Sequence, residues 1–440
     1  MKSFDIVLKN GTILTMDPSN PIIDNGAIGI NGDLISFIGK LNEHSINAKK
    51  VIDAKKGLIL PGLINGHTHA AMTLFRGLAD DLPLMEWLNN HIFPAESRIN
   101  SDFVYTGTLL ACAEMILSGT TTFCDMYLFE ESAISASKVA GMRSIMGEVL
   151  YDFDSPNYGP IENGFTYTEA LIEKWRDDPL VSIAVEPHSL FTCSPDLLIT
   201  ANELSLTHKV PFIIHLAETE DEIIYVEKRF KKRPVQYLNS LGILGPHLIA
   251  CHCVHLDSEE INILNEKGVR VIHNPESNMK LASGVAPINE MISRGIKVGI
   301  GTDGCASNND LDLFGEMDTA AKLHKIREMD ATVMDAETVL KMATIEGAKA
   351  LGIEKITGSI EVGKRADIIV IDINKPHLIP IYNPISHLVY SAKGSDVTNS
   401  IINGRLVMSD RKILTFNLKD VLEQAIAISE DIIKYRKVQN

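Results

Sequence analysis

The chain has 440 residues, with 41 Lys and Arg against 57 Asp and Glu, so its formal net charge is −16. Hydrophobic residues at 45% and charged residues at 22% are ordinary for a globular protein with a large core. The acidic balance argues against nucleic acid as a partner, because phosphate binding needs clustered Lys and Arg. No apolar run approaches the about 20 residues of a membrane span, and the N-terminus lacks a signal-peptide pattern. Six Cys in a chain of this length indicate a reduced, cytoplasmic protein. What remains is a soluble enzyme or binding protein that acts on a small molecule.

Both ends of the chain show short β-type runs separated by turn signals. In residues 1–58, Asn10-Gly11 and Asn31-Gly32 predict hairpin turns, because Asn and Gly tolerate positive φ. The β pattern returns after about Thr357, with a further turn at Asn403-Gly404, and ends in a stretch of helical spacing. We expect the two ends, residues 1–58 and 358–440, to form one small composite β-sandwich domain.

Between these ends, apolar strand candidates alternate with longer amphipathic stretches. The strand candidates are residues 60–66, 120–125, 144–150, 181–187, 210–214, 247–251, 269–273 and 296–301. Eight strands alternating with helices predict an α/β fold, a (β/α)8 TIM-like barrel over residues 59–357. A doubly wound open sheet gives the same local pattern, so alternation alone leaves both open.

Residues able to bind a metal follow several of these strand candidates. His67 and His69 end the first, His215 ends the fifth and Asp303 ends the eighth. Such strand ends converge on one face of a barrel, where barrel enzymes place their active sites. Three imidazoles and a carboxylate suit a borderline metal such as zinc with one position left for water. A His-x-His pair alone is often two ordinary surface residues, but the whole set predicts a single metal ion.

Three further residues sit at strand ends with roles in proton transfer or binding. Glu218 lies three residues after His215, where it can take a proton from the reacting water and pass it on as general base. The alternative for Glu218 is a helix N-terminal carboxylate. His252 ends the sixth strand, where it can stabilise developing charge, and His188 ends the fourth. The fourth position carries no Lys or carboxylate to bridge a second metal, which favours one ion.

Other patterns do not support a different chemistry. Gly299, Gly301 and Gly304 form G-x-G-x-x-G after a strand, but Asp303 inside the motif would repel a pyrophosphate. Cys251 and Cys253 are best interpreted as small packing residues rather than nucleophiles. The H-x-E and P-C-x-x-C signature of the nucleic-acid deaminases is missing.

The sequence resembles a known family in five segments. They are "PGLINGHTHAAMTLFRGLADDLPLMEWL", "IHLAETEDE", "CHCVHL", "NPESNMKLASGVAPI" and "IGTDGCASNNDLDLF". These motifs are similar to those of the amidohydrolase superfamily, and within it to the 5-methylthioadenosine/S-adenosylhomocysteine deaminases. "GSIEVGKRADIIVID" resembles the C-terminal sheet segment of the superfamily, so the resemblance covers nearly the whole chain.

The resemblance implies a metal-dependent adenosine-type aminohydrolase, a C–N hydrolase acting on a cyclic amidine. It would remove the 6-amino group of 5′-substituted adenosines as ammonia, with one Zn²⁺ per chain, for which Fe²⁺ or Mn²⁺ could substitute. The roles it implies are the metal ligands His67, His69, His215 and Asp303; the catalytic residues Glu218, His252 and Asp303; and the substrate-binding residues Glu96, His188, Glu218, Trp87, Ser307 and Asp303. Glu96 would bind the ribose hydroxyls, His188 the base, and Trp87 and Ser307 would lie near the 5′ substituent.

One segment departs from the family pattern. Members that bind the homocysteine carboxylate present arginines after the third strand for bidentate pairing. Here Gly147 to Gly164 contains no Arg or Lys, and Glu148 stands in this segment. We therefore expect neutral 5′-substituted adenosines such as methylthioadenosine to be handled at least as well as S-adenosylhomocysteine.

Two alternatives remain at this point. The same site could act on guanine or another nucleobase, or displace an amine or chloride from a triazine. A barrel that has lost catalysis is the other alternative, although every candidate metal ligand is retained. The sequence leaves open the native metal and whether the chain forms a homo-oligomer.

Overall fold

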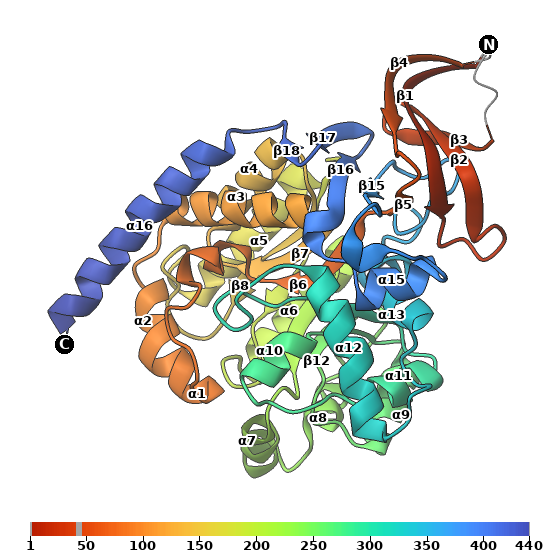
Figure 1. Cartoon of the computed structure of the whole chain (residues 1–440). Helices are drawn as coiled ribbons and strands as arrows, with labels where there is room; N and C mark the ends of the chain where they lie inside the picture. Colours follow the sequence, from red (N-terminus) through yellow and green to blue (C-terminus); the bar gives the residue numbers. More distant parts are fainter. Residues whose placement is uncertain (1, 41–45, 440) are drawn as a thin grey trace.

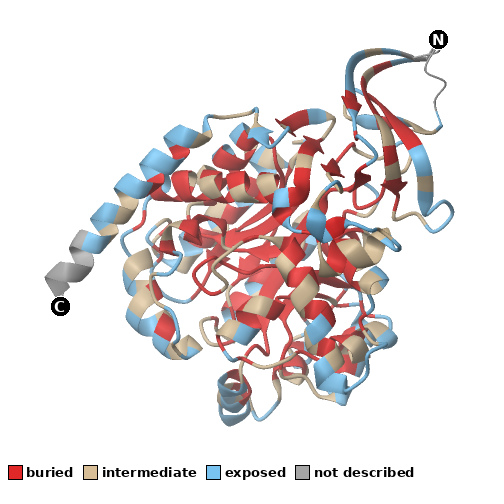
Figure 2. Cartoon of the chain, viewed as in Figure 1, coloured by how far each residue is buried: buried red, intermediate tan, exposed pale blue. Residues whose placement is uncertain are grey.

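The computed structural model describes residues 2–40 and 46–439 as a barrel with a β-rich domain beside it (Figure 1). Residues 1, 41–45 and 440 fall within the predicted domain limits but lie outside the described residues. Buried residues concentrate in the strands, whereas exposed residues concentrate on the outer helix faces and loops (Figure 2).

Eight parallel strand regions follow one another around the barrel, the fourth being split in two. They are β6 Leu63–Thr68, β7 Thr120–Tyr127, β8 Arg143–Leu150, β9 Val181–Ile183 with β10 Glu186–Pro187, β11 Phe212–Leu216, β12 Leu248–His252, β13 Arg270–His273 and β14 Val298–Ile300. Neighbours pair in parallel, and Val185 bridges to Phe212 between the fourth and fifth regions. The ring closes where β14 lies against β6 and the Asp303 N–H donates to the His67 carbonyl at 2.9 Å. The predicted (β/α)8 barrel is therefore confirmed.

Helices cover the outside of the barrel. They are α3 Ser101–Ser118, α4 Glu130–Ala140, α5 Ile161–Trp175, α6 Pro195–His208, α7 Glu220–Phe230, α8 Pro234–Ser240, α9 Ser258–Lys267, α10 Pro275–Lys280, α11 Ile288–Ser293, α12 Leu313–Glu328, α13 Ala336–Met342 and α14 Ile345–Leu351. Local sequence sets their ends. In α9, for example, Asp257 and Glu260 form a reciprocal capping box, and Gly268 ends the helix at φ 70°.

An irregular segment after β6 covers the carboxyl end of the barrel. It comprises η2 Ala70–Phe75, α1 Leu84–Trp87, the single π-helical turn η3 Leu88–Ile92 and α2 Phe93–Glu96. Ion pairs connect it to the rest of the barrel: Arg76 contacts Glu114, and Lys280 donates to Asp80 at 2.5 Å. This segment carries Trp87 and Glu96 to the open end of the barrel.

The two ends of the chain share one nine-stranded sheet. Its strands are β1 Lys2–Leu14, β2 Ile22–Asn31, β3 Leu34–Gly39, β4 Ile46–Asp53, β5 Leu58–Pro61, β15 Ile368–Ile371, β16 Val397–Ile402, β17 Arg405–Ser409 and β18 Lys412–Ile413. β5 and β15 join the halves as antiparallel neighbours, with Leu60 opposite Ile369. Buried residues of both halves, among them Ile28 and Ile401, form a separate apolar core. The predicted composite domain built from both chain ends is confirmed.

Two of the three predicted hairpin turns form. The Asn31-Gly32 turn connects β2 to β3, and Asn403-Gly404 connects β16 to β17 with φ of 49° and 75°. The prediction for Asn10-Gly11 was wrong: β1 runs straight through these residues, which lie at a break in its pairing register with β2. The positive φ of Asn10, 60°, serves a bulge rather than a turn.

The domain limits at 58/59 and 357/358 stay a proposal. The bend between the terminal sheet and the barrel falls at Gly62, because β5 pairs with β15 whereas β6 pairs with β7. Beyond the barrel come η4 Pro376–Leu378, α15 Pro384–Tyr390, η5 Gly394–Asp396 and the terminal helix α16 Leu418–Gln439, which lies along α3 (Figure 1).

Within residues 2–40 and 46–439, no helix combines the length and apolar character needed to cross a bilayer. The longest, α16, buries Val421 and leaves Leu422 and Ile426 exposed. Its polar residues are spread along its length, as in a helix that packs one face against a protein surface.

A buried ion pair joins the barrel to the terminal sheet. The Arg143 guanidinium, at the start of β8, donates to both carboxylate oxygens of Asp367 at 2.7 and 3.2 Å. It also donates to the Asn403 side chain at 3.2 Å and the Pro179 carbonyl at 2.9 Å. Asp367 is fully buried and accepts the Asn403 N–H as well. Bidentate Arg–carboxylate pairing combines charge with fixed geometry.

We expect Arg143→Met to destabilise the protein by about 3–5 kcal/mol, because it leaves the Asp367 carboxylate buried without a cation. Urea unfolding followed by fluorescence measures this loss. The matched control is Lys341→Met, which breaks an exposed pair with Glu337 on α13 and should cost less than about 1 kcal/mol. Equal losses in the two variants would contradict the assigned role of the Arg143 pair.

Candidate active site

Four predicted metal ligands converge at the carboxyl end of the barrel. The Asp303 Oδ1 atom lies 3.5 Å from His67 Nε2 and 3.1 Å from His69 Nε2. The His215 Nε2 atom lies 3.2 Å from that of His67 and 3.4 Å from that of His69. Residues 236 positions apart in the sequence thus form one compact set of donor atoms, which the structure draws from β6, β11 and the end of β14.

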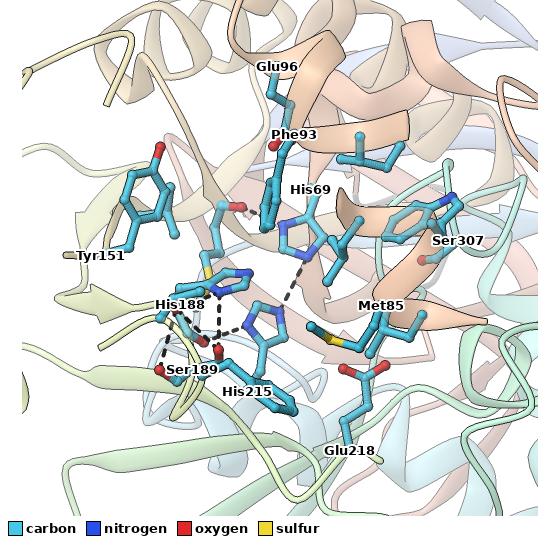
Figure 3. A pocket seen from close by; sticks show the side chains of 18 of the residues that line it. His69, Met85, Phe93, Glu96, Tyr151, His188, Ser189, His215, Glu218 and Ser307 are labelled. Atoms are coloured by element: carbon cyan, nitrogen blue, oxygen red, sulfur yellow. Dashed lines mark hydrogen bonds between the residues drawn. The ribbon is translucent and has the colours of Figure 1, made fainter. Parts of the chain in front are cut away.

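Backbone carbonyls orient two of the imidazoles. His215 Nδ1 donates to the His188 carbonyl at 2.7 Å, and His69 Nδ1 donates to the Met126 carbonyl at 2.5 Å. A ring whose Nδ1 carries the proton presents a free lone pair at Nε2 once the residue is neutral. Such second contacts fix the tautomer of metal-binding histidines. Both Nε2 atoms therefore point at the shared centre, as Figure 3 shows for His69 and His215.

Asp303 is held from two sides. Ser277 and Ser307 donate to its Oδ2 at 2.6 and 2.9 Å, and the Gly304 N–H donates to Oδ1 at 2.8 Å. Burial would raise the pKa of Asp303, but the hydrogen bond from His69 and the positive charge on it hold that pKa well below its usual value. Asp303 is therefore an ionised carboxylate whose Oδ1 faces the imidazoles.

The backbone is strained where these strands end. Ala217, His252 and Asp303 have φ of 51°, 73° and 61°, in the left-handed region that non-glycine residues seldom adopt. Such conformations persist only where surrounding contacts enforce them, and they cluster at functional sites. Here each of them lies at or just after a strand end, where the chain changes direction around the centre.

Glu218 and His252 complete the wall beside this centre. The Glu218 Oε2 atom lies 4.0 Å from His252 Nε2, and both side chains are buried. Burial and the nearby Asp303 carboxylate raise the pKa of Glu218 to about 8. Burial lowers the pKa of His252 to about 4. A carboxyl that titrates near neutral pH can both take up and release a proton during turnover.

A cavity of about 530 Å³ opens above these residues. Apolar and aromatic side chains form most of its wall, among them Met85, Phe93, Tyr151 and Phe153, and Glu96 projects from the side opposite Glu218 (Figure 3). Its size and lining are those of a small-molecule site, where a few polar groups fix the orientation of an otherwise apolar contact.

The structure places all of the predicted substrate-binding residues on this cavity. Trp87 is buried, and its indole N–H has no hydrogen-bond partner among the described residues. Burial raises the pKa of Glu96 to about 7. Burial also lowers the pKa of His188 to about 3, and its Nδ1 lies 2.9 Å from the Thr192 hydroxyl. The Ser307 hydroxyl points at Asp303 rather than into the cavity.

The donor set fits a divalent metal. The Asp303 Oδ1 atom and the Nε2 atoms of His67, His69 and His215 lie 3.1–3.5 Å from their neighbours in this set. His67, His69 and Asp303 alone already form a group able to hold an ion, and nitrogen and oxygen ligands of this kind suit zinc. Burial lowers the pKa of His67 and of His215 well below the ordinary value, so both are neutral and available as ligands. Without positive charge between them, the lone pairs of these imidazoles would repel one another.

Two buried carboxylates support the backbone around the site and were not predicted. The sequence marks them only as polar residues among apolar neighbours. Asp125, fully buried in β7, accepts from the Thr68 hydroxyl at 2.8 Å and the Ala70 N–H at 2.6 Å. It thereby fixes the backbone on either side of His69. Glu222, in α7, accepts from the N–H groups of Ala217 and Glu218 at 3.0 and 3.1 Å, and so holds the strained turn that carries Glu218.

Buried His and Asp side chains able to hold a metal, at the carboxyl end of a (β/α)8 barrel, are the arrangement expected of a metal-dependent hydrolase. The sequence profile of the amidohydrolase family matches residues 58–407, and the chain belongs to that family. A zinc-bound adenosine deaminase from Xanthomonas campestris has the same fold. It superposes with a TM-score of 0.95 at 36% identity, and the match covers 99% of both chains.

Named relatives match along almost the entire chain. A 5-methylthioadenosine/S-adenosylhomocysteine deaminase from Syntrophobacter fumaroxidans is 58% identical over 97% of this chain and 98% of its own. A 5′-deoxyadenosine deaminase from Methanosarcina mazei is 44% identical over 98% of each. Both relatives are named for the same kind of reaction on an adenosine altered at the 5′ position.

We expect removal of the metal with a chelator to lower the melting temperature, and added zinc to restore it. Binding to the folded state alone stabilises by about 4 kcal/mol when the free ion is about 1,000-fold above its Kd. Differential scanning fluorimetry with metal analysis measures both effects. His215→Ala should lose the zinc response. His208→Ala, at the end of α6, removes a partner of Glu169 on α5 and should keep the response. A full zinc response in His215→Ala would be evidence against this metal site.

Proposed function

We propose that the protein hydrolyses the 6-amino group of 5′-substituted adenosines, including 5-methylthioadenosine and S-adenosylhomocysteine, to the inosine analogue and ammonia. One observation carries the proposal: Glu218, with a pKa of about 8, lies beside the metal-ligand set on the wall of a nucleoside-sized cavity. The names of full-length relatives at 44–58% identity support the same reaction.

One Zn²⁺ per chain, held by His67, His69, His215 and Asp303, is the proposed cofactor. Bound there, it would supply Lewis acidity and lower the pKa of the reacting water towards about 7. Nitrogen ligands with a single carboxylate favour zinc over magnesium or calcium, and Fe²⁺ or Mn²⁺ would also accept this set.

Glu218 is the proposed proton carrier. In its ionised form it takes a proton from the water and delivers it to N1 of the purine, which makes C6 electrophilic. The raised pKa of Glu218 suits both halves of this transfer, because a group near its pKa gives and takes protons with little cost. His252 stabilises the oxygen that adds to C6. Asp303 accepts the second proton of the water and passes it to the 6-amino group, so that the C6–N bond breaks and ammonia leaves.

The remaining cavity residues would position the nucleoside. Glu96, across the cavity from Glu218, accepts hydrogen bonds from the ribose hydroxyls, and His188 contacts the base. Trp87 offers an unpaired buried indole N–H near the 5′ substituent, with Ser307 close to the same end. Holding C6 over the water in this way converts the attack into an effectively intramolecular step.

The 5′ substituent is proposed to be neutral by preference. Among the described residues that line the cavity, none is Lys or Arg, whereas Glu96, Glu218, Glu222 and Asp303 are acidic. The carboxylate of a homocysteine tail would therefore meet no cation and would lose part of its hydration. A methylthio group or a methyl group would instead contact the apolar wall.

We further propose that the protein works in the cytoplasm on a small-molecule nucleoside, without nucleic acid. All six cysteines are buried and unpaired in disulfides, as expected of a reducing compartment. Assembly into a homo-oligomer is compatible with the exposed apolar residues of α16.

The zinc-reconstituted enzyme should convert 5-methylthioadenosine and 5′-deoxyadenosine with kcat/KM at least as high as for S-adenosylhomocysteine, and above that for adenosine. The ultraviolet change from adenine to hypoxanthine measures each rate, with ammonia release as control. Guanine and an aminotriazine test the other reactions of this family of folds. A much higher kcat/KM for S-adenosylhomocysteine would contradict the neutral preference, and turnover of guanine or the triazine alone would replace the proposed function.

Glu218→Gln should keep the metal but lower kcat by about 10³-fold, because an amide cannot accept the proton. Metal analysis and steady-state kinetics with methylthioadenosine test this. Glu220→Gln is the matched control: Glu220 begins α7 two residues later and should retain kcat within about twofold. Near-normal kcat in Glu218→Gln would remove Glu218 from the proton transfer.

A further inference from the structure

Two buried asparagines contact the side of His252 that faces away from the cavity. Asn278 Nδ2 lies 2.9 Å and Asn274 Nδ2 lies 3.3 Å from His252 Nδ1. Asn274 follows β13, and Asn278 belongs to α10. All three side chains are buried to 99% or more. Neither asparagine takes part in the proposed metal binding, proton transfer or substrate binding.

The orientation of the two amides decides which ring nitrogen of His252 carries the proton. As placed, both amides donate N–H to Nδ1, and the Oδ1 atoms of Asn274 and Asn278 have no partner among the described residues. An amide N–H₂ group can only donate a hydrogen bond. Both contacts therefore require an acceptor at Nδ1 of His252.

A histidine that accepts hydrogen bonds at Nδ1 carries its proton at Nε2 when it is neutral. His252 Nε2 faces the reaction centre, 4.0 Å from Glu218 Oε2. This nitrogen is also close enough to His67 and His215 for the three to form an alternative metal-binding set. A nitrogen that bears a proton has no lone pair for a metal, so the two amides exclude His252 from the ligands.

We propose that Asn278, assisted by Asn274, is a positioning residue that holds His252 as the Nε2-protonated tautomer. His252 thereby donates a hydrogen bond to the oxygen that adds to C6, and His69 and Asp303 are left to complete the metal site. This inference rests on the proposed deaminase function for the identity of that oxygen. The tautomer itself depends only on the contacts within the protein.

Nitrogen-15 NMR of the histidine-labelled, zinc-loaded enzyme reads the tautomer directly. His252 is assigned by the signals that disappear in His252→Gln. We expect a pyridine-type shift at Nδ1 and a pyrrole-type shift at Nε2, without a zinc-bound signature at either nitrogen. A zinc-bound Nε2 with a protonated Nδ1 would overturn the proposal, and it would do so whether or not the enzyme turns over an adenosine.

Asn278→Asp replaces the donating amide by a carboxylate that only accepts. Nδ1 of His252 should then take up a proton and change to a pyrrole-type shift. We expect kcat to fall by about 10²-fold with KM within about threefold, because a stabilising donor to the transition-state oxygen is lost or reoriented. The zinc content should stay unchanged. Retention of a pyridine-type Nδ1 together with normal kcat would contradict the assignment.

Two further variants separate positioning from folding. Asn278→Leu removes the donor without adding charge and should lower kcat about 10-fold, with the melting temperature recorded alongside. Asn202→Asp is the matched control, because Asn202 contacts His247 Nε2 at 2.7 Å away from the site and should shift only the His247 signals. If Asn202→Asp lowered kcat as much as Asn278→Asp, the effect would be general and the proposal wrong.

Discussion

Three imidazole nitrogens and one carboxylate oxygen lie 3.1–3.5 Å from their neighbours at the carboxyl end of the barrel. Lone pairs at that separation repel one another unless positive charge lies among them. The structure supplies part of this positive charge as a proton on His69. Burial alone would lower the pKa of His69, but its hydrogen bond to Asp303 raises that pKa to about 9. A divalent ion satisfies the same requirement more completely. The orienting carbonyls, the strained strand ends and the buried supporting carboxylates all serve to maintain this one crowded arrangement.

The two sides of the reaction centre are built differently. On one side, carbonyl groups of the barrel strands accept the Nδ1 protons of His69 and His215 and leave lone pairs for a metal. On the other side, amide donors face Nδ1 of His252. The same side chain type thus offers opposite chemistry at Nε2, because the partner of its second nitrogen differs. The proposed ligands and the proposed proton donor therefore differ in the hydrogen bonds made at their Nδ1 atoms.

The barrel and its polar strand ends could be predicted from the sequence because each buried strand is a local apolar run and the polar residue that ends it follows directly in the chain. The bulge at Asn10-Gly11 could not, since local turn chemistry matches a hairpin and only pairing with β2 distinguishes them. Asp125 and Glu222 were missed because each acts on the site through backbone N–H groups, which every sequence contains. The resemblance supplied Glu96 and Trp87, which no pattern of spacing connects to strand ends more than 100 residues away.

The composite sheet has a consequence for how the chain reaches this state during synthesis. β5 leaves the N-terminal strands with an unpaired edge until β15 emerges, more than 300 residues later. Arg143 is likewise synthesised more than 200 residues before Asp367, its buried counterion. Pairings this distant in sequence form slowly, and an open strand edge invites intermolecular pairing in the meantime. The edge of the N-terminal strands is therefore covered only after β15 has been synthesised, by which time all eight strand regions of the barrel have already been made.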